Sequence, residues 1–169
     1  HPHELIPLTF FSERYKAAKS SISEDMSIVK ETFEENGAGS LVTVTGAAGG
    51  IRYIPKMADE DVKVVIHELI QKLSEEDRLL PVGYLFISDL LGNPQLMDRI
   101  GKVFASKLAD RNIDVVMTVE TKGIPIAHAI ARHLNIPVVI VRRDSKVTDG
   151  STVSINYVSG STRRIQKMV

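Results

Sequence analysis

The fold of the first third of the chain is decided by the stretch Leu41-Val42-Thr43-Val44-Thr45-Gly46-Ala47-Ala48-Gly49-Gly50-Ile51-Arg52-Tyr53-Ile54. A β-rich segment stands on each side of a turn of small residues, which is typical of a β-hairpin. The glycines of the turn allow its backbone to lie flat against another surface. The stretch therefore predicts a hairpin whose loop is free to touch a partner.

Two short helices are predicted on the N-terminal side of this hairpin. Residues 8–15 have helical periodicity, and a second helix begins at Ser20 or Ser21, where Glu24 can complete a capping box, and ends at Asn36-Gly37. Its buried stripe is predicted to consist of Ile22, Met26, Val29 and Phe33. Two helices followed by a hairpin predict a winged helix-turn-helix over residues 1–56. Only seven residues precede Leu8, so we expect the first helix of such a domain to be missing.

A winged helix places the start of its second helix in the major groove of DNA, while the wing touches the flanking backbone. Between Arg14 and Ser23 the chain has no acidic residue, and its cations and hydroxyls suit phosphate oxygens and base edges. The residues predicted to bind DNA are Arg14, Lys16, Lys19, Ser20, Ser21, Ser23, Gly49 and Arg52. A plainer interpretation stays open, in which Ser20 to Ser23 only cap a helix and the Gly-rich loop only closes a hairpin.

Composition limits the class of protein. The 169 residues are 43% hydrophobic, enough to bury a core, and the 21 Lys and Arg equal the 21 Asp and Glu. Affinity for a polyanion must therefore come from local clustering of cations. The absence of cysteine excludes disulfides and Cys-ligated zinc. No apolar run approaches the length of a membrane span, and the first residues do not resemble a secretory signal, so we expect a cytoplasmic protein.

The pattern changes near Pro55 to that of an α/β domain. Residues 57–61 open a new helix, on which His67 is interpreted as a partly buried packing residue without a functional role. The elements predicted after it are a strand at 84–87, a turn at 88–93, a helix at 94–110 started by Asn93 and Pro94, a strand at 113–119, a helix at 125–134 and a strand at 136–141. The last three form a β-α-β unit of a parallel sheet.

Ligands of open parallel sheets bind beyond the carboxyl ends of the strands. Here those ends are Glu120-Thr121-Lys122-Gly123 and Arg142-Arg143-Asp144, and both contain residues that can bind phosphate. Gly123 allows backbone amides to approach an anion at the start of the helix, Thr121 adds a hydroxyl and Lys122 adds a charge. A Lys-Gly pair at such a turn also serves simply to cap a helix, so the turn alone does not decide between the two interpretations.

Residues 146–161 alternate polar and β-branched side chains between turn formers, as a hairpin that extends from the domain would. This hairpin is either a mobile lid or a solvated loop. No Ser-His-Asp order, pair of carboxylates or metal-spaced histidine cluster can be assembled elsewhere. The sequence therefore shows no enzyme mechanism.

The chain resembles the purine operon repressors of bacteria, in which a winged-helix domain is fused to a type I phosphoribosyltransferase-like domain. The resemblance rests on residues 2–11, 19–25, 46–50 with 53–55, 121–124 and, most specifically, 146–161. It implies a homodimeric repressor that binds double-stranded operator DNA of purine synthesis genes. It also implies that phosphoribosyl pyrophosphate regulates DNA affinity, and that the phosphoribosyltransferase-like domain has no transferase activity.

The resemblance also assigns roles to individual residues. It makes Thr121-Lys122-Gly123 the pyrophosphate loop, Lys146 through Tyr157 the flexible loop, and Tyr84 a tyrosine beside the effector pocket. The residues implied to bind effector are thus Tyr84, Thr121, Lys122, Gly123, Lys146 and Tyr157. Guanosine tetraphosphate is implied as a second effector for the same pocket. No catalytic cofactor or metal is implied.

The chain departs from the family pattern in two places. Glu120 is an acid where a small residue is expected, and its charge repels effector phosphates unless it points away. The chain also stops at Val169, before the acidic, Gly-rich motif that grips the ribose phosphate. Residues 57–169 are therefore expected to be the N-terminal part of an effector domain with an incomplete parallel sheet, within a longer protein.

Two rival functions remain. One is an active purine phosphoribosyltransferase with an accessory N-terminal domain, although an enzyme has no use for the cations and hydroxyls of residues 16–23. The other is an interaction module whose winged helix binds protein. Alanine at Lys19 and Ser21 distinguishes them from the repressor, because only the repressor would lose operator binding.

Overall fold

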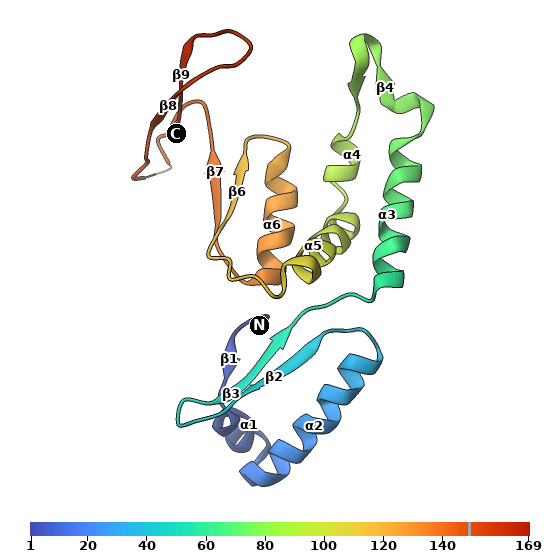
Figure 1. Ribbon diagram of the computed structural model, residues 1–169, viewed down its shortest axis with the longest axis vertical. Coiled ribbons are helices and arrows are strands. Elements are labelled where there is room, and N and C mark those ends of the chain that lie inside the picture. The colour runs from blue at the N-terminus through green and yellow to red at the C-terminus, as the bar shows by residue number, and fades with distance from the viewer. Residues whose placement is uncertain (149) are drawn as a thin grey trace.

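The computed structural model describes residues 1–148 and 150–169, so Asp149, inside the predicted flexible loop, lies outside the described residues. Figure 1 shows two bodies that are joined by the chain between β3 and α3. The lower body holds the N-terminal helices and a small sheet, and the upper body is of the α/β class. None of the helices in the described part of the chain is long and apolar enough to cross a membrane.

The N-terminal body is a winged helix-turn-helix, as predicted. Its elements are β1 (Leu5–Ile6), α1 (Leu8–Tyr15), α2 (Lys19–Glu35), β2 (Ser40–Val44) and β3 (Gly50–Ile54). The three strands form an antiparallel sheet in the order β1-β3-β2. Ile22 of α2 and Leu41 and Ile51 of the sheet are buried, and the rings of Phe33 and Tyr53 pack 5.5 Å apart. These apolar contacts hold α2 against the sheet.

Two details of α2 differ from the prediction. The helix begins at Lys19 after Ala18, with no side-chain cap, so the predicted capping box of Ser20 or Ser21 with Glu24 is wrong. A tight turn between α1 and α2 defines the start of α2 instead. In this turn the Ser12 carbonyl accepts a hydrogen bond of 3.2 Å from the Ala17 amide, and the Ser12 hydroxyl donates one of 2.5 Å to the Ala17 carbonyl. Val29 is 37% exposed rather than buried, and Ile22 alone of the predicted stripe is fully buried.

The upper body contains the predicted β-α-β unit. Its elements are α3 (Asp59–Leu73), short 3-10 turns at Glu76–Arg78 and Pro81–Gly83, β4 (Leu79–Leu80), β5 (Tyr84–Leu85), α4 (Ser88–Leu91), α5 (Pro94–Leu108), β6 (Val116–Val119), α6 (Gly123–Leu134), β7 (Val138–Val141), β8 (Ile155–Val158) and β9 (Ile165–Met168). Strands β6 and β7 pair in parallel, with Val119 opposite Val141. As predicted, Asn93 starts α5, where its side chain accepts from the Leu96 amide at 3.0 Å.

The core of this body is the crossing of α5 and α6. A Cβ atom on Gly101 would lie 2.5 Å from the carbonyl oxygen of Ala129, so only glycine allows this approach. Ala105 is fully buried beside Ile130 and Leu134. The crossing fixes α6, and with it the turn that carries the predicted phosphate site.

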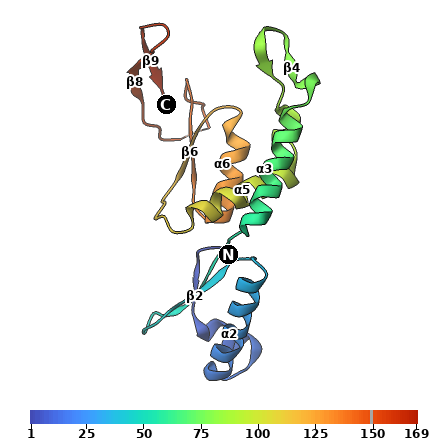
Figure 2. The ribbon, with the colours of Figure 1, turned by 45° about the vertical axis from the view of Figure 1, so that its right-hand side comes forward.

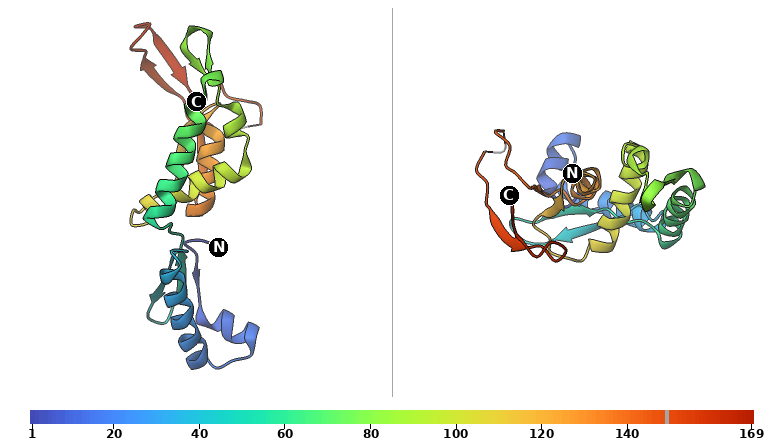
Figure 3. Two further views of the ribbon diagram at one scale, coloured as in Figure 1. Left: turned by 90° about the vertical axis from the view of Figure 1, so that its right-hand side faces the viewer. Right: turned by 90° about the horizontal axis from the view of Figure 1, so that it is seen from above.

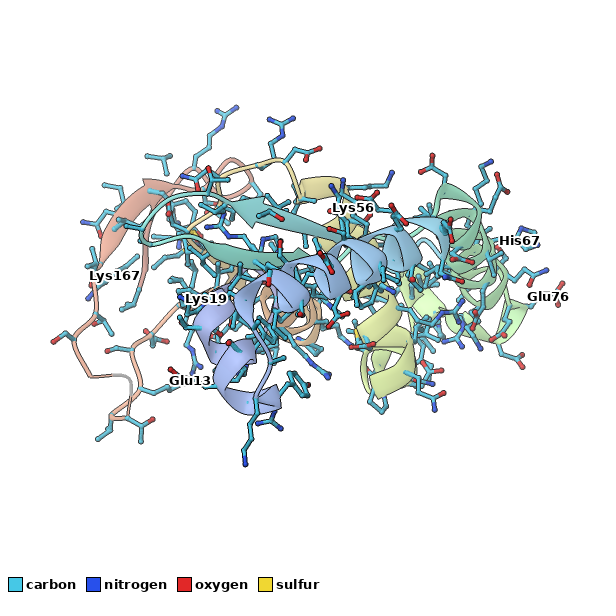
Figure 4. All side chains as sticks on the ribbon, turned by 90° about the horizontal axis from the view of Figure 1, so that it is seen from below. Glu13, Lys19, Lys56, His67, Glu76 and Lys167 are labelled. Atoms are coloured by element: carbon cyan, nitrogen blue, oxygen red, sulfur yellow. The ribbon has the colours of Figure 1, made fainter. Side chains whose placement is uncertain are left out.

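Several predicted strands differ in the upper body. The strand at 84–87 is only β5, which pairs with β4 outside the parallel sheet, and the turn at 88–93 contains α4. The exposed Met117 shows that β6 is covered by α6 on one face only. His67 is exposed, not partly buried, on the outer side of α3 in Figure 4.

The predicted hairpin at 146–161 is displaced along the chain. Its strands are β8 and β9, and residues 159–164 form the turn, closed by a 3.0 Å hydrogen bond from the Ser159 amide to the Arg164 carbonyl. Arg163 adopts a left-handed conformation there, with φ of 53°. The alternating stretch ended at Ser161 and therefore included β8 and the start of the turn but not β9.

Candidate functional site

The predicted DNA-binding residues of the two helices gather at one end of the winged helix. The six of them that lie between α1 and the first turns of α2 are all exposed: Arg14, Lys16, Lys19, Ser20, Ser21 and Ser23. Figure 4 shows Lys19 at the start of α2, next to α1. Since α2 has no side-chain cap, the plainer interpretation of the serines as capping groups fails. Their hydroxyls face solvent.

The wing lies beside this end of α2. A hollow of about 370 Å³ is lined by Lys19 together with the wing turn, including Gly49. A Cβ on Gly49 would lie 2.4 Å from the carbonyl oxygen of Val44, so the turn requires glycine. Thr43 and Thr45 also line the hollow and are exposed, although neither was among the predicted DNA-binding residues. The available signal was their spacing of two residues at the end of β2 and directly after it.

Arg52 does not belong to this surface. It lies on β3 between Leu5 and Val42, and its Nε atom is buried without a hydrogen-bond partner. Burial, and secondarily the charge of Arg52, lower the pKa of His3. The structure thus separates Arg52 from the other predicted DNA-binding residues, because strand alternation turns it away from the buried Ile51 and α2.

The second predicted site lies where β6 ends and α6 begins. Thr121 and Lys122 are exposed there, and Gly123 is the first residue of the helix. A Cβ on Gly123 would lie 2.1 Å from the hydroxyl of Thr118, so glycine lets α6 start directly against β6. The free amides and the dipole of the helix start favour an anion at this turn.

Lys122 has a partner that the sequence did not predict. Its ammonium donates a hydrogen bond of 2.7 Å to the hydroxyl of Ser88, the first residue of α4. The neighbouring Asp89 receives two hydrogen bonds, of 2.9 and 3.0 Å, from the buried guanidinium of Arg78. Hydrogen bonding from Arg78 lowers the pKa of the Asp89 carboxyl. This ion pair anchors α4, and so holds Ser88 beside the turn.

Glu120 points toward a cation of the neighbouring strand. Its carboxylate oxygen Oε2 lies 3.8 Å from Nε of Arg142, the residue that follows β7. The expected repulsion of an anion is therefore partly offset by Arg142, which the sequence had placed at the same edge.

The remaining predicted effector residues stand apart from the turn. Tyr84 is 70% exposed on the β4–β5 hairpin, and Lys146 is exposed between β7 and β8. The hydroxyl of Tyr157 donates to Gln166 at 2.6 Å, within the β8–β9 hairpin. Figures 2 and 3 show the two hairpins, and in the view from above they lie on opposite sides of α6. The structure brings Thr121, Lys122 and Gly123 together, but not these three.

The hollow nearest the β8–β9 hairpin is mainly apolar. It measures about 580 Å³, and Met117, Val139, Ile155 and Met168 are among its lining residues. None of the six predicted effector residues lines it. Within the described residues there is also no group of three or more acidic or histidine side chains placed to hold a metal ion.

Comparison with known proteins separates the chain into the same two parts. The family described as "Bacterial purine repressor, N-terminal" matches residues 1–55, and the family "Phosphoribosyl transferase domain" matches residues 87–168. The purine biosynthesis transcriptional repressor PurR of Bacillus subtilis is 62% identical over 99% of this chain and 59% of its own length.

Two further relatives extend the comparison. The probable purine biosynthesis transcriptional regulator PurR of Streptococcus pneumoniae is 52% identical over 99% of this chain and 62% of its own length. The purine biosynthesis transcriptional activator PurR of Lactococcus lactis is 45% identical, with the same coverage. The chain thus spans about three fifths of these relatives. One of them is named a repressor and another an activator.

Proposed function

The chain belongs to the bacterial purine repressor family, and from this premise we propose that its protein regulates transcription of purine biosynthesis genes by binding operator DNA. The observation that carries the proposal is the exposed end of the winged helix, where Lys19 lines one hollow with the wing turn. Its exposed cations and hydroxyls match the contacts that a recognition helix makes with phosphates and base edges.

The distribution of charge along the winged helix favours DNA binding at the start of α2. The exposed cations Arg14, Lys16 and Lys19 lie in a stretch without acids between Arg14 and Ser23, which is flanked by Glu13, Glu24 and Asp25, whereas Glu31, Glu34 and Glu35 lie toward the other end of α2. A polyanion is therefore attracted to the stretch from Arg14 to Ser23 and repelled by the far end of α2. In a homodimer, two such surfaces would contact the two half-sites of an operator.

The upper body is proposed to sense phosphoribosyl pyrophosphate, with guanosine tetraphosphate as a competing ligand. The start of α6, Lys122 and Thr121 supply the amides, charge and hydroxyl that a pyrophosphate group requires. Residues 57–169 act in this proposal as part of an effector domain that makes no phosphoribosyl transfer. Whether the effector releases or strengthens DNA binding would decide between repressor and activator behaviour.

The DNA-binding proposal is tested with the full natural protein and promoter DNA of purine synthesis genes. Fluorescence anisotropy at fixed salt would compare the promoter with unrelated DNA of equal length. We expect at least about a thousandfold preference for the promoter, as for other specific DNA-binding proteins. Equal affinity for both DNAs would overturn the proposal.

The rival function is a purine phosphoribosyltransferase with an accessory domain. Two features favour this function, because such an enzyme would share both: the match to the phosphoribosyltransferase family, and the turn at the start of α6, which can bind an anion. Release of pyrophosphate from phosphoribosyl pyrophosphate in the presence of a purine base measures this reaction. Turnover by the full protein would establish the enzyme, and its absence supports the regulator.

A further inference from the structure

Arg78, which lies between α3 and β4, is a charged residue with only 8% of its surface exposed. Its guanidinium donates hydrogen bonds to the Lys72 carbonyl, to the Glu75 carboxylate at 3.0 Å and to the Phe86 carbonyl at 3.2 Å. Two more, of 2.9 and 3.0 Å, reach the two carboxylate oxygens of Asp89. An arginine is buried to this degree only when its charge is paired, and here the same side chain also joins several segments of the chain.

One set of these contacts closes the base of the β4–β5 hairpin. Arg78 directly precedes β4 and Phe86 directly follows β5, and the Phe86 amide donates a 2.8 Å hydrogen bond to the Arg78 carbonyl. The guanidinium binds the carbonyl of the same Phe86, so Arg78 engages both backbone polar groups of that residue. Tyr84 lies two residues before Phe86, on β5. Arg78 therefore fixes the base of the hairpin that carries Tyr84.

The contact with Asp89 fixes α4. The two terminal nitrogens of one planar guanidinium engage the two oxygens of the carboxylate, and this two-pronged geometry sets orientation as well as distance. Ser88, the residue before Asp89, accepts the 2.7 Å hydrogen bond from the Lys122 ammonium. The orientation of α4 therefore sets the position at which Lys122 is held.

We propose that Arg78 is a positioning residue of the effector site, which sets Tyr84 and Lys122 relative to each other without touching the effector. This inference rests on the proposed effector function. Tyr84 comes from the β4–β5 hairpin and Lys122 from the start of α6, and a site built from separate elements keeps its geometry only if residues behind it lock those elements together. The task requires arginine, because lysine has no planar fork of donors.

Isothermal titration of the full natural protein with phosphoribosyl pyrophosphate tests this role. Arg78→Lys keeps the charge but cannot hold Phe86 and both oxygens of Asp89 at once, so we expect affinity for the effector to fall at least about tenfold. Asp89→Asn leaves the hairpin contact in place and weakens only the contact with α4, so we expect a smaller loss. Promoter affinity without effector should stay within about twofold in both variants, because Arg78 lies outside the winged helix.

A double-mutant cycle with Lys122→Ala distinguishes positioning from a general loss of stability. In the natural protein we expect Lys122→Ala to lower effector affinity at least about tenfold, as the loss of a charged hydrogen bond does. In the Arg78→Lys background the same change is expected to lower it less than about threefold, because Lys122 is already displaced. A residue that only stabilises the fold would leave the effect of Lys122→Ala equal in both backgrounds, and that result would overturn the inference.

Arg99→Lys is the matched control, because Arg99 pairs with Glu68 in the same body but joins α3 to α5. We expect it to change effector affinity less than about twofold. A loss equal to that of Arg78→Lys would show that any lost ion pair has this effect, and would overturn the inference. Unchanged effector affinity in Arg78→Lys would also overturn it, while the proposed effector function stands. If the natural protein does not bind phosphoribosyl pyrophosphate, the proposed effector function itself fails, and this inference fails with it.

Discussion

The backbone amide of Met57 donates a hydrogen bond of 3.0 Å to the hydroxyl of Ser106 on α5. Met57 belongs to the short connection between the two bodies and also packs against Val62, Val65 and Val103. The connection is therefore fixed to α5. This helix begins at Pro94 and contacts α4, which carries Ser88. This contact ties the connection to the upper body.

Ser106→Ala is expected to weaken that attachment. The Met57 amide would lose its acceptor, which costs about 1 kcal/mol of unfolding free energy for a partly buried group. Chemical denaturation of the natural protein and the variant measures the change. Ser74→Ala is the control, because its hydroxyl donates only to the Ile70 carbonyl of its own helix at 2.8 Å. Equal losses in both variants would contradict a special role of the connection.

Gly123→Ala tests the close approach of α6 to β6. The added Cβ would lie 2.1 Å from the Thr118 hydroxyl, so the Thr118 side chain, the helix or the strand must shift, at a cost of about 1–3 kcal/mol. Thr118→Ala removes the clashing oxygen, and the double variant should therefore regain most of the lost stability. Thermal unfolding of the four proteins measures this rescue. A double variant whose loss is the sum of the two single losses would exclude the predicted clash.

The surroundings of His3 predict a dependence of stability on pH. Its pKa in the folded protein is lowered from 6.5 by burial and by the charge of Arg52. As pH falls through about 6.5, the unfolded state therefore takes up a proton before the folded state does, and stability falls. The free energy of unfolding between pH 8 and 5 would show this decline.

His3→Gln should flatten the decline, because the residue that titrates is removed. His67→Gln is the control, since His67 is exposed on α3. The two variants and the natural protein would be compared over the same pH series. A decline that survives unchanged in His3→Gln would assign the pH dependence to another group.

Lys19→Ala is expected to weaken promoter binding and to lower the slope of log affinity against log salt by about 1, as the loss of one phosphate contact would. Lys63→Ala, on α3, removes another exposed lysine, which pairs with Glu60, and should leave DNA binding unchanged. Ser21→Ala is expected to reduce the preference for the promoter more than the salt slope, because a neutral hydroxyl reads base edges rather than charge. Anisotropy over a salt series measures all three.

The sequence predicted the elements whose pattern is local. The hairpin at residues 41–54, the two helices before it and the β-α-β unit were all found, because turn residues and hydrophobic periodicity depend on near neighbours. The start of α2 was mispredicted because the turn after α1, and not a serine cap, defines it. Local patterns thus predicted which helices and strands form more reliably than the residues at which they begin and end.

The sites depended on contacts between distant residues, and here the sequence was less informative. It indicated Lys122 as a phosphate contact, but its partner Ser88 comes from α4, which was predicted to be part of a turn. It treated Glu120 as a departure from the family pattern, whereas the register of β6 and β7 places it beside Arg142. Such pairings follow from the packing of α5, α6 and the strands, which no single stretch of sequence contains.

The proposed function requires one protein to join specific DNA binding to an effector site. The most direct test measures affinity of the full natural protein for purine promoter DNA with and without phosphoribosyl pyrophosphate, at constant ionic strength. We predict that the effector changes promoter affinity at least about fivefold, and that Lys122→Ala, which removes the cation of the turn, reduces this response. A promoter affinity that phosphoribosyl pyrophosphate leaves unchanged would contradict the proposed link between the effector site and DNA binding.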